Sequence, residues 1–422
     1  MDCDYSFKMK DCLLGTQMLF VAFGALVLVP LLTGLDPNVA LLTSGVGTLI
    51  FQGITRGKVP IYLASSFAFI SPIIYGVQTW GIPATLSGLA VSGVLYMVFS
   101  LIIRLKGSDS LLKYLPAVVT GPVIMVIGLS LAPVAVHMAL GRTGDGATVL
   151  FDEKHALIVA LISLFVTATV SISGKGLLRC IPILMGILAG YGTSLFLGMV
   201  DFLPMAQASW LCIPKFVLPQ WSWPAVLFIL PVAIAPAIEH VGDIIAIGSI
   251  TGKNYLEDPG IHRTMLGDGV ATTVASMLGG PPNTTYSEVS GAVALIKAFN
   301  PAIMTWAAIS AILLSFIGKL GALLRTIPSP VMGGIMILLF GAIAVVGMKN
   351  LIQSNTDVTK PRNLIIIAII MIFGIGGMSL SIDNFSIRGI GLAGIVGVLL
   401  NLLLPDPDKD GDLAEDSPQR ED

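Results

Sequence analysis

The sequence predicts an all-α protein that crosses a membrane many times, because of both its composition and the lengths of its apolar segments. Of 422 residues, 55% are apolar and only 11% are charged, whereas about a quarter of a soluble domain is charged. The apolar residues form many separate runs of roughly 20, the length that a helix needs to cross a hydrocarbon core. An ordinary soluble enzyme is therefore excluded.

Twelve apolar runs lie between charged or turn-rich breaks and have the length of ordinary spanning helices. We expect them near residues 12–34, 38–55, 83–105, 116–138, 156–173, 180–200, 223–247, 265–279, 301–323, 329–348, 363–382 and 387–404.

Two further segments, 59–72 and 279–297, are too short to cross as helices and are rich in Pro, Gly, Ser and Thr. We expect residues 64–69 and 283–288 to be extended and to pair as short antiparallel β-strands. Counted as half-extended spans, the two segments are the third and tenth of fourteen crossings. They then occupy the same position in two halves of seven.

A second observation favours two related halves. A constant offset of 212 residues relates Pro116, Val119 and Gly121 to Pro328, Val331 and Gly333. Halves with an odd number of spans insert in opposite orientations, so the chain is predicted to be a 7+7 inverted repeat, a plan typical of secondary transporters. The expected units are a cytoplasmic N-terminus (1–11), the first repeat (12–200), an extracytoplasmic connector (201–222), the second repeat (223–404) and an acidic tail (405–422).

The distribution of charge agrees with this plan. With the N-terminus inside, 17 Lys and Arg residues fall on the inner side and six on the outer side, as the positive-inside rule requires. Residues 406–422 contain eight acids and two bases, a composition typical of a solvated, disordered segment. No basic domain for nucleic acid is present, and the four scattered Cys residues form no metal-binding pattern.

Ionisable residues at membrane depth cluster in the second half of the chain. Each isolated carboxylate at the bilayer centre costs at least about 2.5 kcal/mol on insertion scales, so several together indicate a cavity filled by water or ligand. The two broken segments point to the same place, because non-helical backbone at this depth persists only where it is buried or lines a cavity. The alternative is a pair of re-entrant hairpins that only pack. The candidate proton-coupling residues are Glu239, His240, Asp243, Asp268 and Glu288.

Helical spacing relates three of these residues. Glu239 and Asp243 are four residues apart and share one helix face, while His240 is rotated by about 100°. Two carboxylates on one face repel unless one of them is protonated, which is the behaviour of a proton-coupling site. In the simpler alternatives, Asp243 accepts a hydrogen bond from an amide or hydroxyl in the packed core, and His240 is a packing residue whose ring nitrogens are satisfied.

Five motifs carry a resemblance to a known family. They are AFGALVLVPLL at 22–32, GKVPIYLASSFAFISP at 57–72, AIEHVGD at 237–243, GIHRTMLGDG at 260–269 and PPNTTYSE at 281–288. The chain resembles the nucleobase-ascorbate transporter family over residues 12–404, and within it the bacterial uracil permeases, which are uracil:proton symporters.

The resemblance implies a set of substrate-binding residues. Glu239 and Glu288 would hold the pyrimidine ring, and the backbone amides of Phe67 and Ser287 would contact it. Tyr286 resembles the site tyrosine of the family, Phe340 stands where a tyrosine can line the pocket, and Asp268 matches a position that is acidic in many members.

The chemistry of uracil fits this assignment. Uracil presents two ring N–H donors and two carbonyl acceptors, so two carboxylates and two backbone amides supply the matching set. Phe67, Phe69 and Tyr286 could form flat apolar walls.

Two departures from the family pattern bear on substrate and coupling. Asp243 stands where some uracil permeases have a histidine. Residues 289–291 read Val-Ser-Gly, whereas uracil permeases usually have Asn-Ile-Gly and purine members have Gln-Asn-x-Gly. Glu288 favours uracil over xanthine or urate, but a xanthine or purine permease remains the alternative.

The resemblance further implies a proton as the coupling ion, no cofactor, no metal, a homodimer, and a bacterial inner-membrane location with both termini cytoplasmic. A core with spans three, eight and ten would move against a gate built from spans five to seven and twelve to fourteen. No enzymatic activity is expected.

Two remote alternatives are an anion transporter of related fold and an intramembrane aspartyl protease. Carboxylates at both contact positions would repel an anion. A protease needs two facing acids that share one proton, and neither Asp243 nor Asp268 lies in the expected Gly-x-Gly-Asp spacing.

Overall fold

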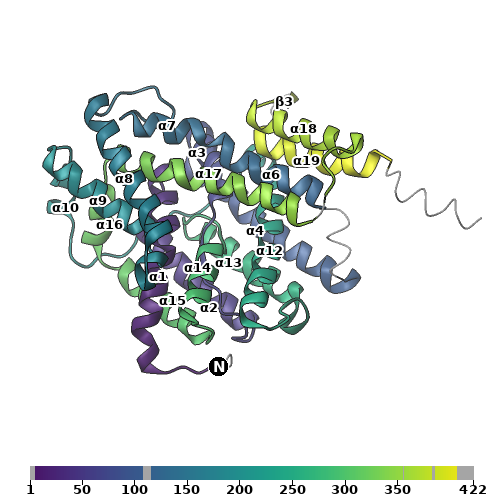
Figure 1. Ribbon diagram of the computed structural model, residues 1–422, viewed down its shortest axis with the longest axis horizontal. Helices are drawn as coiled ribbons and strands as arrows, with labels where there is room; N and C mark the ends of the chain where they lie inside the picture. The colour runs from purple at the N-terminus through teal and green to yellow at the C-terminus, as the bar shows by residue number, and fades with distance from the viewer. Residues whose placement is uncertain (1–4, 108–115, 355, 383–384, 406–422) are drawn as a thin grey trace, which may run out of the picture.

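The computed structural model describes residues 5–107, 116–354, 356–382 and 385–405, and it is mostly helical (Figure 1). Within these residues, six helices are long and apolar enough to cross a membrane. They are Met9–Thr33, Ile82–Lys106, Ala117–Ala139, Glu153–Ser173, Trp223–Thr251 and Ser329–Gln353. The prediction of a helical, multi-pass membrane protein is confirmed, whereas the predicted acidic tail lies outside the described residues from 406 onward.

Short breaks divide the helices, so the structure has more elements than there are predicted spans. The first half comprises α1 (Cys12–Thr33), α2 (Pro37–Ile54), β1 (Leu63–Ser65), α3 (Ile70–Trp80), α4 (Ile82–Lys106), α6 (Ala117–Ser130), α7 (Ala132–Ala139), α8 (Glu153–Ser173) and α9 (Pro182–Phe196). The second comprises α10 (Leu203–Gln207), α11 (Trp223–Ile229), α12 (Ile234–Thr251), α13 (Ile261–Met277), β2 (Asn283–Thr285), α14 (Ser287–Ile296), α15 (Ala302–Ser315), α16 (Gly318–Arg325), α17 (Ser329–Gln353), α18 (Pro361–Ile375), β3 (Ser379–Ile382), β4 (Phe385–Arg388) and α19 (Gly389–Leu403). Short 3-10 or π-helical turns are η1 (Met9–Asp11), η2 (Phe67–Phe69), η3 (Gly176–Cys180), η4 (Leu230–Ala233) and η5 (Leu256–Gly260).

The two predicted broken segments meet as a two-stranded antiparallel sheet, β1 with β2. Leu63 pairs with Thr285 and Ser65 with Asn283, and all six strand residues are buried. The strands are shorter than predicted, because Phe67–Phe69 forms a 3-10 turn and α14 begins at Ser287. A longer strand would expose unpaired backbone groups to apolar surroundings, whereas a helix satisfies them internally.

Hydroxyl groups from neighbouring helices complete the edges of this small sheet. On β1, the Leu63 amide donates to Thr48 Oγ1 (3.0 Å), and Ser44 Oγ donates to the Leu63 carbonyl oxygen (2.7 Å). On β2, Thr272 Oγ1 donates to the Asn283 carbonyl oxygen at 2.7 Å. Buried backbone groups that lack a ladder partner are therefore paired by side chains of α2 and α13.

Small residues let the helices pack closely in two groups. In the first, α13 crosses α4 so tightly that a Cβ on Gly93 would lie 2.5 Å from the Gly269 carbonyl oxygen and 2.6 Å from the Thr273 amide nitrogen. In the second, a Cβ on Gly121 of α6 would lie 2.9 Å from the Gly347 carbonyl oxygen of α17. Close approach at small residues is the usual basis of helix association in membranes. In Figure 1, α6, α17 and α18 lie in the upper part of the molecule, and α1, α2 and α15 lie in the lower part.

The last predicted spans differ from the structure. Residues 363–382 were expected to form one helix, but α18 ends at Ile375 and the chain continues into the β3–β4 hairpin. Gly377 adopts a left-handed conformation (φ +66°), and the Met378 amide donates back to the Phe373 carbonyl oxygen at 3.0 Å. This is a Schellman end, for which glycine is suited because it has no Cβ. The two consecutive glycines at 376 and 377 are the sequence signal for this helix end.

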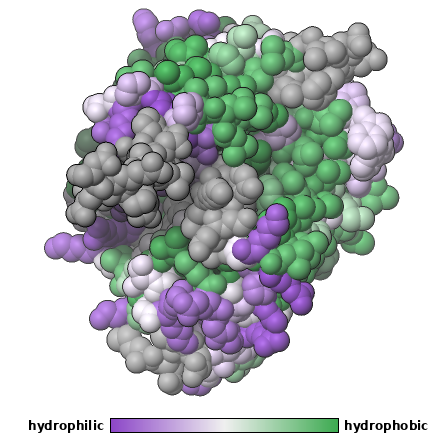
Figure 2. Space-filling view, turned by 90° about the vertical axis from the view of Figure 1, so that its right-hand side faces the viewer, coloured by the Kyte–Doolittle hydropathy of each residue, from purple (hydrophilic) through white to green (hydrophobic). Residues whose placement is uncertain are grey.

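Much of the molecular surface is apolar. Figure 2 shows a broad hydrophobic surface on one face of the molecule, with hydrophilic residues gathered beside and below it. On α8, Leu161, Phe165 and Ile172 are 52%, 71% and 82% exposed. Such extended apolar exposure is unfavourable in water and suits contact with lipid.

The close crossing of α4 and α13 leads to a stability prediction. We expect Gly93→Ala to lower stability by about 1–3 kcal/mol, because the added methyl group must push the two backbones apart. Gly53→Ala is the matched control, since a Cβ there meets nothing within 4 Å. Thermal unfolding in detergent measures both, and equal melting temperatures for the two variants would contradict the packing described.

Candidate functional site

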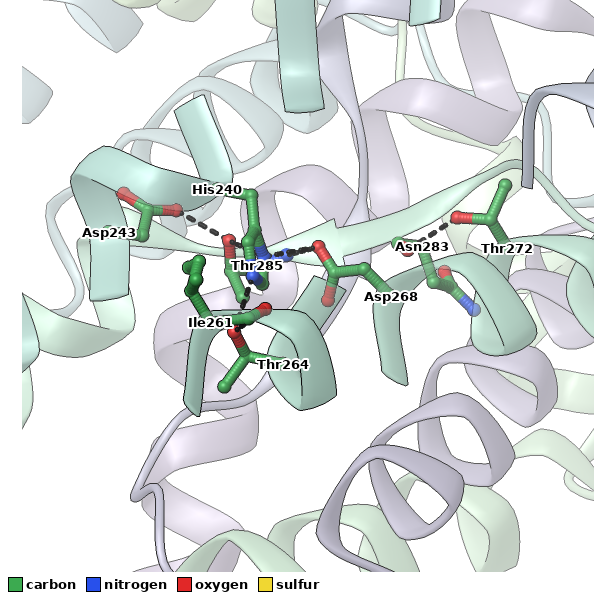
Figure 3. Close-up of polar contacts among 8 residues, drawn as sticks. All are labelled: His240, Asp243, Ile261, Thr264, Asp268, Thr272, Asn283 and Thr285. Atoms are coloured by element: carbon green, nitrogen blue, oxygen red, sulfur yellow. Dashed lines mark hydrogen bonds and ion pairs between the residues drawn. The ribbon is translucent and has the colours of Figure 1, made fainter. Parts of the chain in front are cut away.

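A cluster of buried polar side chains joins α12, α13 and β2 (Figure 3). Helix α12 supplies His240 and Asp243, α13 supplies Thr264 and Asp268, and β2 supplies Thr285. All five residues are at most 4% exposed. The sequence predicted three of the five residues, and the fold brings all five together.

Hydrogen-bond partners determine where the protons of His240 lie. Its Nε2 is 2.9 Å from Thr264 Oγ1, and its Nδ1 is 2.8 Å from Asp268 Oδ2. The Thr264 hydroxyl donates to the Ile261 carbonyl oxygen at 3.0 Å, and a carbonyl oxygen can only accept. The Thr264 oxygen must therefore accept the proton of His240 Nε2–H, since a hydroxyl has a single proton to donate.

This assignment leaves one proton between His240 Nδ1 and Asp268 Oδ2. Either an imidazolium donates to a carboxylate, or a protonated carboxyl donates to a neutral ring. In either arrangement the pair of His240 and Asp268 has no net charge, which explains how two ionisable groups can be buried together. Both ring nitrogens of His240 therefore have hydrogen-bond partners in the core.

Thr285 connects the acids of the two helices. Its Oγ1 donates to Asp243 Oδ2 at 2.8 Å, and its backbone amide donates to Asp268 Oδ2 at 3.2 Å. Asp243 therefore accepts from a hydroxyl in the packed core, which is the alternative considered from the sequence. Asp243 also lines a cavity, so it anchors β2 on one side and borders open space on the other.

Glu239 and Asp243 line a cavity of about 690 Å³ between α12 on one side and α6 and α17 on the other. This size lies within the range of small-molecule sites. The shared face that the i,i+4 spacing predicted is thus the cavity face, while His240 points away from it into the core. The lining also includes Thr120, Ser290, Gly291, Lys349, Asn350, Gln353 and Ser354.

The crossing of the strands brings two predicted aromatic residues together. The rings of Phe67 and Tyr286 have centroids 6.0 Å apart with an interplanar angle of 50°, and both residues are buried. Phe67 begins the η2 turn and Ser287 begins α14, so both predicted amides belong to helix starts, where N–H groups lack intrahelical partners. The side chains of Ser287 and Glu288 lie outside the part of the chain that the structure describes.

Phe340 belongs to α17, a helix that carries no other predicted site residue. It is 2% exposed in α17, and its carbonyl oxygen faces the close approach to Gly128 of α6. Among the described residues, the lining of the cavity includes none of the predicted aromatic residues Phe67, Tyr286 and Phe340. Phe340 is therefore buried where α17 contacts α6.

Sequence reasoning missed Thr264, Thr285 and Tyr96. Tyr96 is 1% exposed in α4 and lies within electrostatic range of Asp268 and Glu239. Neither its hydroxyl nor Asp268 Oδ1 has a hydrogen-bond partner among the described residues. Thr264 precedes Asp268 by four residues, so helical spacing could have indicated it, whereas nothing local marks Tyr96.

The link from β2 to α12 predicts a specific loss of stability. We expect Thr285→Val to destabilise the protein by about 1–3 kcal/mol, because Asp243 loses a buried hydrogen-bond donor. Thr285→Ser is the control, since it keeps the hydroxyl and should restore most of the stability. Thermal unfolding in detergent compares them, and a Val variant as stable as the Ser variant would show that the Asp243 bond contributes nothing.

Comparison with known proteins gives extensive matches. The model of a family described as the Permease family matches residues 9–382. The probable uracil permease of Haemophilus influenzae is 56% identical over 94% of this chain and 95% of its own length. The uracil permeases of Bacillus caldolyticus and Escherichia coli are 45% and 40% identical, covering 93% and 92% of this chain and 91% and 90% of their own.

Solved structures share the fold at low sequence identity. The transmembrane domain of the cyanobacterial bicarbonate transporter BicA aligns with a TM-score of 0.64 and 14% identity, over 94% of this chain and 99% of that one. The murine anion transporter Slc26a9, in an inward-facing state, aligns with a TM-score of 0.68 and 14% identity, over 94% and 68%. At this identity the likeness concerns the fold alone.

Proposed function

Because this chain belongs to the permease family of nucleobase-ascorbate transporters, we propose that it imports uracil together with a proton. The chain is a permease and not an enzyme. The observation that carries the proposal is the position of Glu239 and Asp243, which face a cavity between two groups of helices, next to the strand crossing. The similar proteins named uracil permease support the choice of substrate.

The proposed substrate lies between carboxylates, amides and an aromatic wall. Glu239 and Glu288 accept from the ring N–H groups, and the amides of Phe67 and Ser287 donate to the carbonyl oxygens. Phe67 and Tyr286, whose rings lie 6.0 Å apart, flank the flat ring. Phe340 would line this site from α17, where it is buried beside α6.

The proposed mechanism is alternating access within a 7+7 inverted repeat of fourteen spans. The core comprises α1–α4 and α11–α15, the gate comprises α6–α9 and α17–α19, and the cavity separates them. Two features support the repeat: β1 and β2 occupy corresponding places, and α6 and α17 each begin after an extended proline, Pro116 and Pro328. The proposal places the protein in the inner membrane of a bacterium, with both termini in the cytoplasm. The end of the cavity at Lys349 and Asn350 is then the cytoplasmic end.

Proton coupling would follow from the acids at the cavity. Two ionised carboxylates beside one neutral ring repel each other, so a proton on Glu239, Asp243 or Glu288 favours uracil binding and leaves after release. His240 and Asp268 share a proton already and would tune this step through Thr285. No cofactor takes part in this scheme, and two copies would assemble as a homodimer.

Removal of one carboxylate tests the site. We expect Glu239→Gln to reduce uracil uptake by about tenfold to a hundredfold, because a hydrogen bond to a charged group is lost. Glu257→Gln, at an exposed position in the η5 turn before α13, should transport at the wild-type rate. Uptake of labelled uracil into proteoliposomes gives both values. Full uptake by the Glu239 variant would refute the assignment.

The coupling ion and the ring specificity can be tested in the same vesicles. An acidic exterior should accelerate uptake several-fold over equal pH, because protonation precedes binding in the proposed scheme. Uptake that ignores an imposed pH gradient would contradict proton symport. Excess unlabelled xanthine that competes as well as uracil does would instead identify a purine permease.

A further inference from the structure

A positively charged pocket lies where the end of α4 meets the start of α13. It has a volume of about 410 Å³ and shares no lining residue with the cavity of the proposed transport site. The lining comprises Ile54, Met97, Ser100, Leu101, Arg104, His262, Arg263 and Leu266. Two guanidinium groups and an imidazole thus gather in one small pocket without an acidic residue in its lining.

Among the described residues, the two arginines have no counter-charge. Across the described residues, neither Arg104 nor Arg263 forms an ion pair or hydrogen bond. Both are near enough to act electrostatically on His262. Ser100 Oγ donates to the His262 carbonyl oxygen at 2.5 Å, which holds the two helix ends together despite the repulsion between their cations. An anion in the pocket would relieve this repulsion.

The surroundings of the pocket are apolar. Val98, Leu101 and Leu105 of α4 are 45%, 53% and 74% exposed, and their spacing of three and four residues places them on one face of the helix. Leu101 belongs to both the exposed face and the pocket lining. A hydrocarbon surface therefore leads directly into a group of cations.

We propose that this pocket binds the phosphate headgroup of an anionic phospholipid, with the acyl chains lying along the exposed face of α4. Arginine forms bidentate hydrogen bonds to phosphate oxygens, and basic pockets between membrane helices are suited to anionic headgroups. A free phosphate would satisfy the cations but leave Val98, Leu101 and Leu105 without a partner, so the lipid accounts for both halves of the surface.

The bound lipid would stabilise the part of the protein that carries the polar cluster. Helix α13 holds Thr264 and Asp268, and α4 crosses it at Gly93. A headgroup that bridges Arg104 of α4 and Arg263 of α13 ties these helices together at the end opposite to β2. The lipid pocket is thus separate from the proposed substrate site. The lipid stabilises the contact of α4 with α13, and α13 carries two residues of the polar cluster.

The test measures lipid binding by the purified full-length protein in detergent. Phosphatidylglycerol and phosphatidylcholine are titrated separately, and binding is read by native mass spectrometry and by the shift in melting temperature. The wild type should bind phosphatidylglycerol about tenfold more tightly than phosphatidylcholine, and Arg104→Gln/Arg263→Gln should abolish this preference. Arg142→Gln/Lys154→Gln removes the same charge elsewhere and should keep the preference.

Three outcomes would overturn the proposal. A double variant that retains the preference would place anionic lipid elsewhere, and a control that loses it would show a general effect of charge. Inorganic phosphate that stabilises the wild type as strongly as phosphatidylglycerol would exclude the lipid as the ligand. If the double variant fails to fold, the single variants Arg104→Gln and Arg263→Gln are compared, and each should lose part of the preference.

Discussion

Backbone polar groups cannot be left unpaired in the interior of a membrane protein, and this constraint shapes the centre of the fold. The chain is interrupted twice at depth, and each interruption would be unstable alone. The two three-residue strands pair with each other. The hydroxyls of Ser44, Thr48 and Thr272 pair further backbone groups at the strand edges. The strands end as soon as helices can begin, which places two helix starts beside the crossing.

The polar cluster follows from the same arrangement. Because β2 must be anchored between α12 and α13, Thr285 binds Asp243 through its side chain and Asp268 through its amide. His240 then shares a proton with Asp268 and removes its net charge from the core. Asp243, which faces the cavity, is thus linked through Thr285 to Asp268 and His240, which do not. The proposed site and the strand crossing therefore share residues.

Local patterns in the sequence predicted many of these features. The 3.6-residue period placed Glu239 and Asp243 on one face, and the short segments rich in Pro, Gly, Ser and Thr identified the strands. The lengths of the strands were overestimated, because the competition between ladder and helix depends on partners that are distant in sequence. The β3–β4 hairpin was missed although Gly376 and Gly377 precede it.

Composition and periodicity alone determined that the chain is helical and embedded in a membrane, since the solvation of apolar and charged groups depends only on their number and spacing. They also determined which ionisable residues lie at depth. The tertiary structure decided the pairing of those residues. Tyr96 and Thr285 carry no local signal of function, and Thr264 is marked only by its helical spacing from Asp268. The roles of Asp243 and His240 could not be separated until their partners were known. A hydrogen bond requires two groups within about 3 Å, and only folding brings residues 240, 268 and 285 to that distance.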